Sequence, residues 1–158
     1  MDALKQALRR LAKAVVVITS ADGVDRFAMV STAVSELSFD PPSMLVCVNQ
    51  SASLYRVLAL GAPFAVNILH HRHESIARRC GGLVKGAARF DEGEWVDTAL
   101  GVSRLADAQA GIICRNVRRV DHGTHGIFIG NVEEVFLNGV PEPLIYLDGR
   151  YTHAHLVT

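Results

Sequence analysis

The 158-residue sequence has no excess of either charge, since 16 Lys and Arg residues balance 16 Asp and Glu residues. Nucleic-acid-binding domains are usually basic because they must neutralise phosphates, so we expect no nucleic-acid partner. No apolar run approaches the about 18 residues of a membrane-spanning helix. The apolar stretch that follows the basic N-terminal residues, 14–19, is too short for a secretory signal. We therefore expect a cytoplasmic protein with no membrane partner.

Cysteines and the common nucleotide-binding motifs are also scarce. The three cysteines, Cys47, Cys80 and Cys114, form no CxxC pair, which argues against a disulfide framework or a structural zinc site. The sequence contains no GxGxxG after a strand and no GxxxxGK[ST], so Rossmann and P-loop folds lose their main support. GxSxG is missing as well, which removes the usual hydrolase nucleophile.

The composition indicates a folded protein with a substantial core. Hydrophobic residues make up 49% of the chain and charged residues 20%, a balance that rules out disorder. At this length one domain is the default, and we expect residues 1–158 to form a single domain. A mean hydropathy of +0.22 is high for a monomer and suggests a buried subunit interface.

Runs of apolar and β-branched residues predict about seven short strands and two or three small helices. Asp2 is expected to cap a first helix that has Leu4, Leu8 and Leu11 on one face. Residues 81–100 are expected to form an exposed or ligand-facing loop, and Asn138-Gly139 has the sequence of a hairpin turn. This pattern favours a barrel or sandwich over a βαβ array. The expected strands are 14–19, 26–37, 44–49, 64–69, 112–120, 127–137 and 144–147, and the later helices are 51–60 and 74–80.

Small polar residues at the ends of strands are the candidates for ligand binding. The segment 49–53, Asn-Gln-Ser-Ala-Ser, joins a strand to a helix. Its Ser51 and Ser53 could hold a phosphate, although the N-cap preference of serine by itself favours an ordinary N-cap for Ser51. His125 begins a strand, where it could donate a hydrogen bond to a ligand or lie in solvent as a turn residue.

Two further segments combine cations or histidines. Residues 85–90, Lys-Gly-Ala-Ala-Arg-Phe, could bind a pyrophosphate or form a plain surface loop. Residues 70–73, His-His-Arg-His, could bind a metal with Cys80, but their spacing fits no standard zinc pattern. A solvated loop is the expectation for them, and we predict no metal site.

Two sequence blocks carry a specific resemblance. DPPxxLVCVNxSxS covers 40–53 and GTHxIFIGxV covers 123–132. At this separation they resemble the short-chain flavin reductase family, the reductase components of two-component flavin monooxygenases. The resemblance extends over nearly the whole chain. Its other matching stretches are 14–23, 26–39, 54–58, 64–69, 88–90, 111–122, 133–135 and 143–151.

The resemblance implies a mainly β split barrel with a few short helices. It implies a homodimer that binds FMN or FAD near the subunit interface. Residues 28–32 would run along the isoalloxazine and ribityl groups, and residues 50–53 would form the phosphate-binding turn. The residues that correspond to flavin-binding positions are Ala28, Met29, Val30, Ser31, Thr32, Asn49, Gln50, Ser51, Ala52, Ser53, Lys85, Arg89, Phe90, His125 and Tyr151.

The implied activity is hydride transfer from NADH or NADPH to the flavin, followed by diffusion of reduced flavin to a separate oxygenase. His125 would orient the nicotinamide as the catalytic residue. The alternatives are an electron carrier with permanently bound FMN, a substrate-specific flavin oxidase and a plain structural dimer. Gly126 departs from the family, which often has Ser or Thr at that position, and 81–100 matches poorly. The sequence leaves open the choice of FMN or FAD, the nicotinamide nucleotide and the oxygenase.

Overall fold

The computed structural model describes residues 1–158. All three α-helices have seven residues or fewer, and none has the length or apolar character to cross a membrane. The elements follow one another as α1 (Asp2–Leu8), β1 (Lys13–Ala14), β2 (Val16–Ala21), β3 (Arg26–Ser31), β4 (Val34–Phe39), β5 (Pro42–Asn49), α2 (Ser53–Ala59), β6 (Phe64–Ile68), η1 (His71–His73), α3 (Glu74–Arg78), η2 (Arg79–Leu83), η3 (Gly86–Phe90), β7 (Trp95–Asp97), β8 (Ser103–Leu105), β9 (Ala110–His122), β10 (His125–Leu137), β11 (Leu144–Leu147) and β12 (Arg150–His153).

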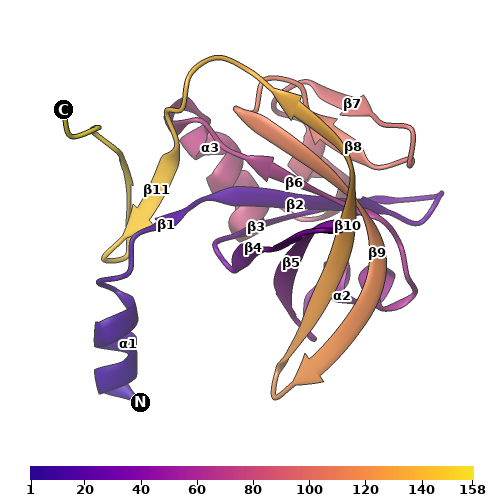
Figure 1. Ribbon diagram of the computed structural model, residues 1–158, viewed down its shortest axis with the longest axis horizontal. Helices are drawn as coiled ribbons and strands as arrows, with labels where there is room; N and C mark the ends of the chain where they lie inside the picture. The colour runs from indigo at the N-terminus through magenta and orange to yellow at the C-terminus, as the bar shows by residue number, and fades with distance from the viewer.

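A seven-stranded antiparallel sheet organises the molecule (Figure 1). Its strand order is β3-β2-β6-β9-β10-β5-β4, so β3 and β4 are its two edges and the sheet is not closed. Two smaller sheets, β1-β11-β12 and β7-β8, flank it. The expected mainly β architecture is thus confirmed, with an open sheet in place of a continuous barrel.

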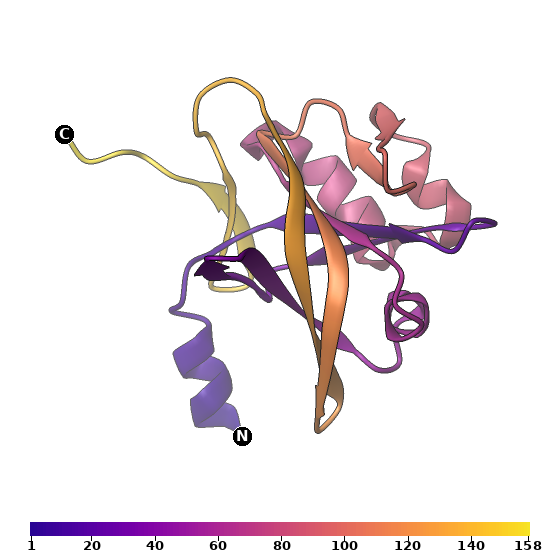
Figure 2. The same cartoon turned by 45° about the vertical axis from the view of Figure 1, so that its right-hand side comes forward.

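Strand β2 is buried on both of its faces. Val17 of this strand and the preceding Val15 pack with α3 residues in one core cluster, while Val16 and Ile18 pack with α2 residues in the other. Figure 2 shows α3 and α2 on opposite sides of this strand. Because side chains alternate along a strand, only a continuous apolar run can supply both cores. This explains why the segment 15–18 consists entirely of Val and Ile.

A buried amide joins three strands beside this core. The side chain of Asn67, in β6, is fully buried and donates to the Val17 carbonyl at 2.9 Å. Its Oδ1 accepts a hydrogen bond from the Leu105 amide at 2.8 Å. A buried amide is stable only when its donors and acceptors are satisfied, so Asn67 fixes β8 against β2 and β6.

Several predictions made from local sequence were wrong, because contacts with distant parts of the chain decide the structure of these segments. The strand expected over 26–37 is two strands, β3 and β4, which lie at opposite edges of the sheet. Asn138-Gly139 closes no hairpin, because the Asn138 side chain instead donates to the carbonyls of Ala106 and Ala108. The last strand, β12, was not predicted.

The N-terminal helix and the expected loop also differ from their predictions. Met1 is the N-cap of α1, so Asp2 lies in the first turn and does not cap it. No residue of α1 is buried, and the helix projects from the sheet (Figure 1). Residues 81–100, expected as a loop, contain the end of η2, all of η3 and the short strand β7.

Glycine at position 130 allows β10 to cross the core closely. The β9–β10 register shifts next to it, and a Cβ there would lie 2.5 Å from Phe64 Cζ and 2.5 Å from Cys114 Cβ. We expect Gly130→Ala to lower the free energy of unfolding by about 1–3 kcal/mol through overpacking.

Chemical denaturation of Gly130→Ala and of a matched variant, Gly111→Ala, checks this expectation. A Cβ at Gly111, on the neighbouring strand, would have its closest contact at 3.7 Å. Gly111→Ala should therefore unfold close to the wild type. Equal destabilisation of the two variants would contradict the close packing at Gly130.

Candidate functional site

The candidate site is a cleft along the edge strand β3. Its larger part has a volume of about 800 Å³ and is lined by Ala28, Ser51, Ser53, Lys85 and Arg89 among others. A smaller hollow of about 240 Å³ shares Ser53 and Arg89 with it. The remaining walls of this hollow are mostly apolar and include Met29, Val30, Ala52 and Cys80. One side of the site is therefore polar and cationic, and the other is apolar.

The position of β3 leaves backbone groups available to a ligand. Since β3 pairs only with β2, one row of its N–H and C=O groups has no strand partner. Arg89 fills part of this edge, because its Nη1 donates to the Ala28 carbonyl at 2.7 Å. The Arg89 Nε donates to the Val84 carbonyl at 3.0 Å. These two bonds hold the guanidinium beside β3.

The cleft has an excess of positive charge, although the chain as a whole has a net charge of zero. Arg26, Lys85 and Arg89 line its larger part, and Asp25 is the single carboxylate among the lining residues. Neither Lys85 nor Arg89 takes part in an ion pair. Uncompensated cations in a cleft attract anions, so the charge pattern fits a phosphate-bearing ligand.

The turn before α2 adds hydroxyl groups to this cleft. The Asn49 Oδ1 accepts hydrogen bonds from both the amide and the hydroxyl of Ser51, each at 2.9 Å. The N-cap of α2 is Ala52, and no side chain caps the helix. The interpretation of Ser51 as an N-cap is therefore wrong. Ser51 and Ser53 are exposed at the cleft, where the Ser53 hydroxyl can donate to an anion. The Ser51 hydroxyl already donates to Asn49 and would have to leave that partner to do the same.

Phe90 follows Arg89 but lies in the core. Its side chain packs edge-on against Trp95, with ring centroids 5.1 Å apart, and the Arg26 guanidinium lies 4.3 Å from its ring centroid. Phe90 thus packs against the guanidinium of Arg26. The contact of Phe90 with a ligand stays a prediction.

His125 lies at the tip of the β9–β10 hairpin, next to the polar turn. It pairs with Asn49 across β10 and β5, and the Gln50 amide donates to the Thr124 carbonyl at 2.9 Å. The ring of His125 is exposed, with Nδ1 2.8 Å from the Thr124 hydroxyl. The fold therefore brings His125 to the segment 49–53, from 72 residues or more along the chain.

A tyrosine explains why position 126 is glycine. A Cβ on Gly126 would lie 2.7 Å from Tyr55 Cε2 and 2.9 Å from Asp121 Oδ1. The Tyr55 hydroxyl donates to Asp121 Oδ1 at 2.8 Å, and this bond raises the pKa of Tyr55. Tyr55 thus ties α2 to the hairpin and occupies the space a larger residue would need. Nothing in the local sequence indicated this link.

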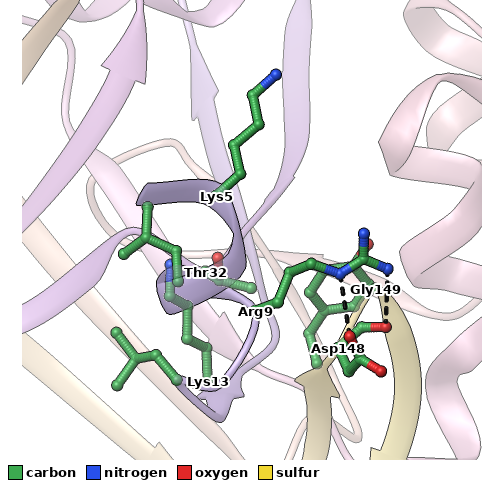
Figure 3. A pocket seen from close by; sticks show the side chains of 9 residues that line it. Lys5, Arg9, Lys13, Thr32, Asp148 and Gly149 are labelled. Atoms are coloured by element: carbon green, nitrogen blue, oxygen red, sulfur yellow. Dashed lines mark hydrogen bonds and ion pairs between the residues drawn. The ribbon is translucent and has the colours of Figure 1, made fainter. Parts of the chain in front are cut away.

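Seven of the predicted residues do not line the cleft: Asn49, Gln50, Phe90 and His125, and also Ser31, Thr32 and Tyr151. The Ser31 hydroxyl accepts a hydrogen bond from the Ala33 amide at the end of β3. Thr32 lines a separate pocket of about 500 Å³ beside α1, where Arg9 pairs with Asp148 at 3.0 Å (Figure 3). Tyr151, in β12, packs against Arg78 of α3, whose guanidinium carbon lies 5.0 Å from the ring centroid.

The cleft offers no activated nucleophile. Burial raises the pKa of Cys80 to about 11, so its thiol is protonated at neutral pH. Cys80 therefore does not act as a thiolate nucleophile in this cleft.

The histidine segment 70–73 is not the solvated loop that was expected. His73 is only 5% exposed, and its Nε2 lies 3.1 Å from Asp107 Oδ2. Cys80 is in the core and does not join these histidines; Glu142 does, in a group with His70 and His71.

The structure is therefore a mainly β protein with an open sheet and a cationic, partly apolar cleft at one sheet edge. The flavin reductase like domain family matches residues 8–155, and the chain belongs to this family.

Named relatives and a solved structure agree with the assignment. The FMN reductase (NADH) RutF of Agrobacterium fabrum (strain C58 / ATCC 33970) is 34% identical over 93% of this chain and 84% of its own. The reductase component of an FADH(2)-dependent resorcinol hydroxylase from Rhizobium sp. (strain MTP-10005) is 36% identical. The match covers 95% of this chain and 85% of the relative. The NADH:FAD oxidoreductase SgcE6 of Streptomyces globisporus C-1027, solved with NAD and FAD fragments, is 26% identical and has a TM-score of 0.89. The match covers 96% of this chain and 91% of the SgcE6 chain.

Proposed function

We propose that this protein is an NADH:flavin oxidoreductase that reduces FMN or FAD and releases the product to a separate oxygenase. The observation that carries the proposal is the cationic and apolar cleft along β3, which is lined by several of the residues that the resemblance predicts to bind flavin. The names of the relatives support NADH as the donor and a flavin as the acceptor. The resorcinol hydroxylase relative supports an oxygenase partner.

The residues present fit a flavin. The unpaired edge of β3 offers backbone groups for the polar rim of the ring system, and Met29, Val30 and Ala52 offer apolar surface for its face. Ser53 and Lys85 offer a hydroxyl and a cation for the phosphate, and Ser51 would offer a second hydroxyl once it is released from Asn49. Bound flavin supplies the hydride-accepting chemistry, and the protein supplies orientation and electrostatics.

Arg89 and His125 have distinct proposed roles. The fixed guanidinium of Arg89 stabilises negative charge that develops on the reduced ring. His125 orients the nicotinamide above the cleft from the hairpin tip. Hydride transfer needs no general base, which agrees with the absence of an activated nucleophile or a carboxylate pair in the cleft.

The proposed contact of Lys85 with the phosphate can be tested by comparing FMN with riboflavin. We expect Lys85→Ala to raise the KM for FMN by about tenfold, because a charge-assisted hydrogen bond contributes about 1.5 kcal/mol. Riboflavin has no phosphate, so its KM should stay unchanged. Steady-state NADH oxidation with each flavin measures both values.

Lys13→Ala is the matched control, since Lys13 lines the separate pocket beside α1. It should leave both constants near the wild-type values. A parallel rise for FMN and riboflavin in Lys85→Ala would contradict the phosphate contact.

For His125 we expect an effect on the nicotinamide. His125→Ala should raise the KM for NADH more than it weakens flavin binding, because its ring is placed to contact the donor. Steady-state kinetics gives the KM, and fluorescence titration with FMN gives the flavin affinity. An unchanged KM with a large loss of flavin affinity would overturn this role.

We also propose that the protein is a homodimer joined through one face of the main sheet. In β5 and β10, Val46 and Phe128 point into the core, so their neighbours point the opposite way. Leu45 pairs with Ile129 and Cys47 pairs with Ile127, and all four are only partly buried. Apolar residues adjacent on an uncovered sheet face support a second copy of the chain as the cover.

A charge on this face should separate the subunits. We expect Ile129→Glu to raise the dimer dissociation constant at least about tenfold, since burying an unpaired carboxylate is costly. Sedimentation equilibrium measures the change. Leu60→Glu, at a position that is 83% exposed after α2, should leave the dimer intact. A stable Ile129→Glu dimer would place the interface elsewhere.

A further inference from the structure

Histidines are concentrated at one corner of the molecule. Of the seven in the chain, His70, His71, His73, His153 and His155 gather where η1, the β10–β11 connection and the end of β12 meet. This corner is separate from the β3 cleft, and none of these residues has a part in the proposed function. The concentration therefore needs its own explanation.

Backbone hydrogen bonds fix the three segments against one another. The His71 amide donates to the Glu142 carbonyl at 2.9 Å, and the Leu144 amide donates to the Leu69 carbonyl at 3.0 Å. His153 pairs with Leu144 between β12 and β11. The side chains of His71, Glu142 and His153 thus project from segments whose relative positions are set by the fold.

The spacing of these side chains suits a metal ion. One possible ligand atom each from His70, His71 and Glu142 lies within 4.8 Å of the others. The ring centroids of His71 and His153 are 5.3 Å apart, with an interplanar angle of 39°. Two imidazoles bound through nitrogen to one tetrahedral zinc have ring centres about 5 Å apart. His153 is not among the residues whose ligand atoms lie within 4.8 Å of one another, so its exposed side chain has to rotate to bring a nitrogen to an ion bound by His71.

His70 positions the carboxylate and is not itself a ligand. Its Nδ1 accepts a hydrogen bond from the Arg72 amide at 3.1 Å, so the proton of the neutral ring is on Nε2. Nε2 then donates to Glu142 Oε2 at 2.8 Å. The other oxygen, Oε1, remains free to bind a cation. Hydrogen bonds that orient a ligand in this way are typical of protein metal sites.

His73 is excluded because both of its ring nitrogens are occupied. Nδ1 accepts from the His70 amide at 3.2 Å, and Nε2 lies 3.1 Å from Asp107. The available set is two imidazoles and one carboxylate, at a surface where water can complete the coordination. This combination of nitrogen and oxygen ligands suits a borderline divalent transition metal ion.

We propose that His71, Glu142 and His153 form a binding site for a divalent transition metal ion, with Zn²⁺ as the best match. The ion would join the C-terminal strand β12 to η1 and to the connection before β11. Because β11 also pairs with β1, the site fastens the small β1-β11-β12 sheet to the main body.

The test is a titration of the full-length, metal-free protein with Zn²⁺ in competition with a chromophoric chelator. The expected result is one ion per chain. His71→Ala, His153→Ala and Glu142→Gln should each weaken binding at least about tenfold, the lower limit even for loss of an outer-shell partner. His122→Ala, which removes an exposed histidine at the far hairpin, should leave the affinity unchanged.

Thermal unfolding provides a second readout that needs no flavin or NADH. Zn²⁺ should raise the Tm of the wild type and of His122→Ala, but not that of His71→Ala or His153→Ala. The proposal is overturned if Zn²⁺ does not bind, or if the ligand substitutions leave the affinity unchanged. Loss of binding in Cys47→Ser would equally overturn it by placing the ion at the half-exposed thiol.

Discussion

The burial of β2 on both faces is the constraint on which the rest of the structure depends. Its alternate side chains fill two separate cores, one closed by α3 and the other by α2. A strand buried in this way must lie inside the sheet, between β6 and β3. β3 is thereby left as an edge strand next to the segments that follow α3, and the cleft forms between them.

The candidate site follows from that edge. Arg89 bonds to the Ala28 carbonyl and so brings η3 against β3, while the pairing of β5 with β10 brings His125 to the turn before α2. Cations, hydroxyls, a free strand edge and apolar wall then surround one space without any activated side chain. Under the proposed function, the protein binds the flavin in this space and orients it toward the nicotinamide nucleotide.

The sequence predicts those elements whose cause is local. β2, β5 and β6 are mostly apolar runs rich in β-branched residues, and α2 buries Leu54, Val57 and Leu58, which recur at i, i+3 and i+4 along its sequence. The division of 26–37 into two edge strands could not be predicted, because it depends on pairing partners elsewhere in the chain. The core position of Phe90 and the meeting of His70 with Glu142, 72 residues apart, likewise appear only when distant segments pack.

The central claim is that the β3 cleft holds a diffusible flavin that NADH reduces. The most direct measurement is NADH oxidation by the purified protein, with and without added FMN, FAD or riboflavin. Turnover that depends on added flavin and saturates with it is the predicted result. A protein that keeps flavin through purification and consumes no NADH, whichever flavin is supplied, would contradict the claim and indicate an electron carrier.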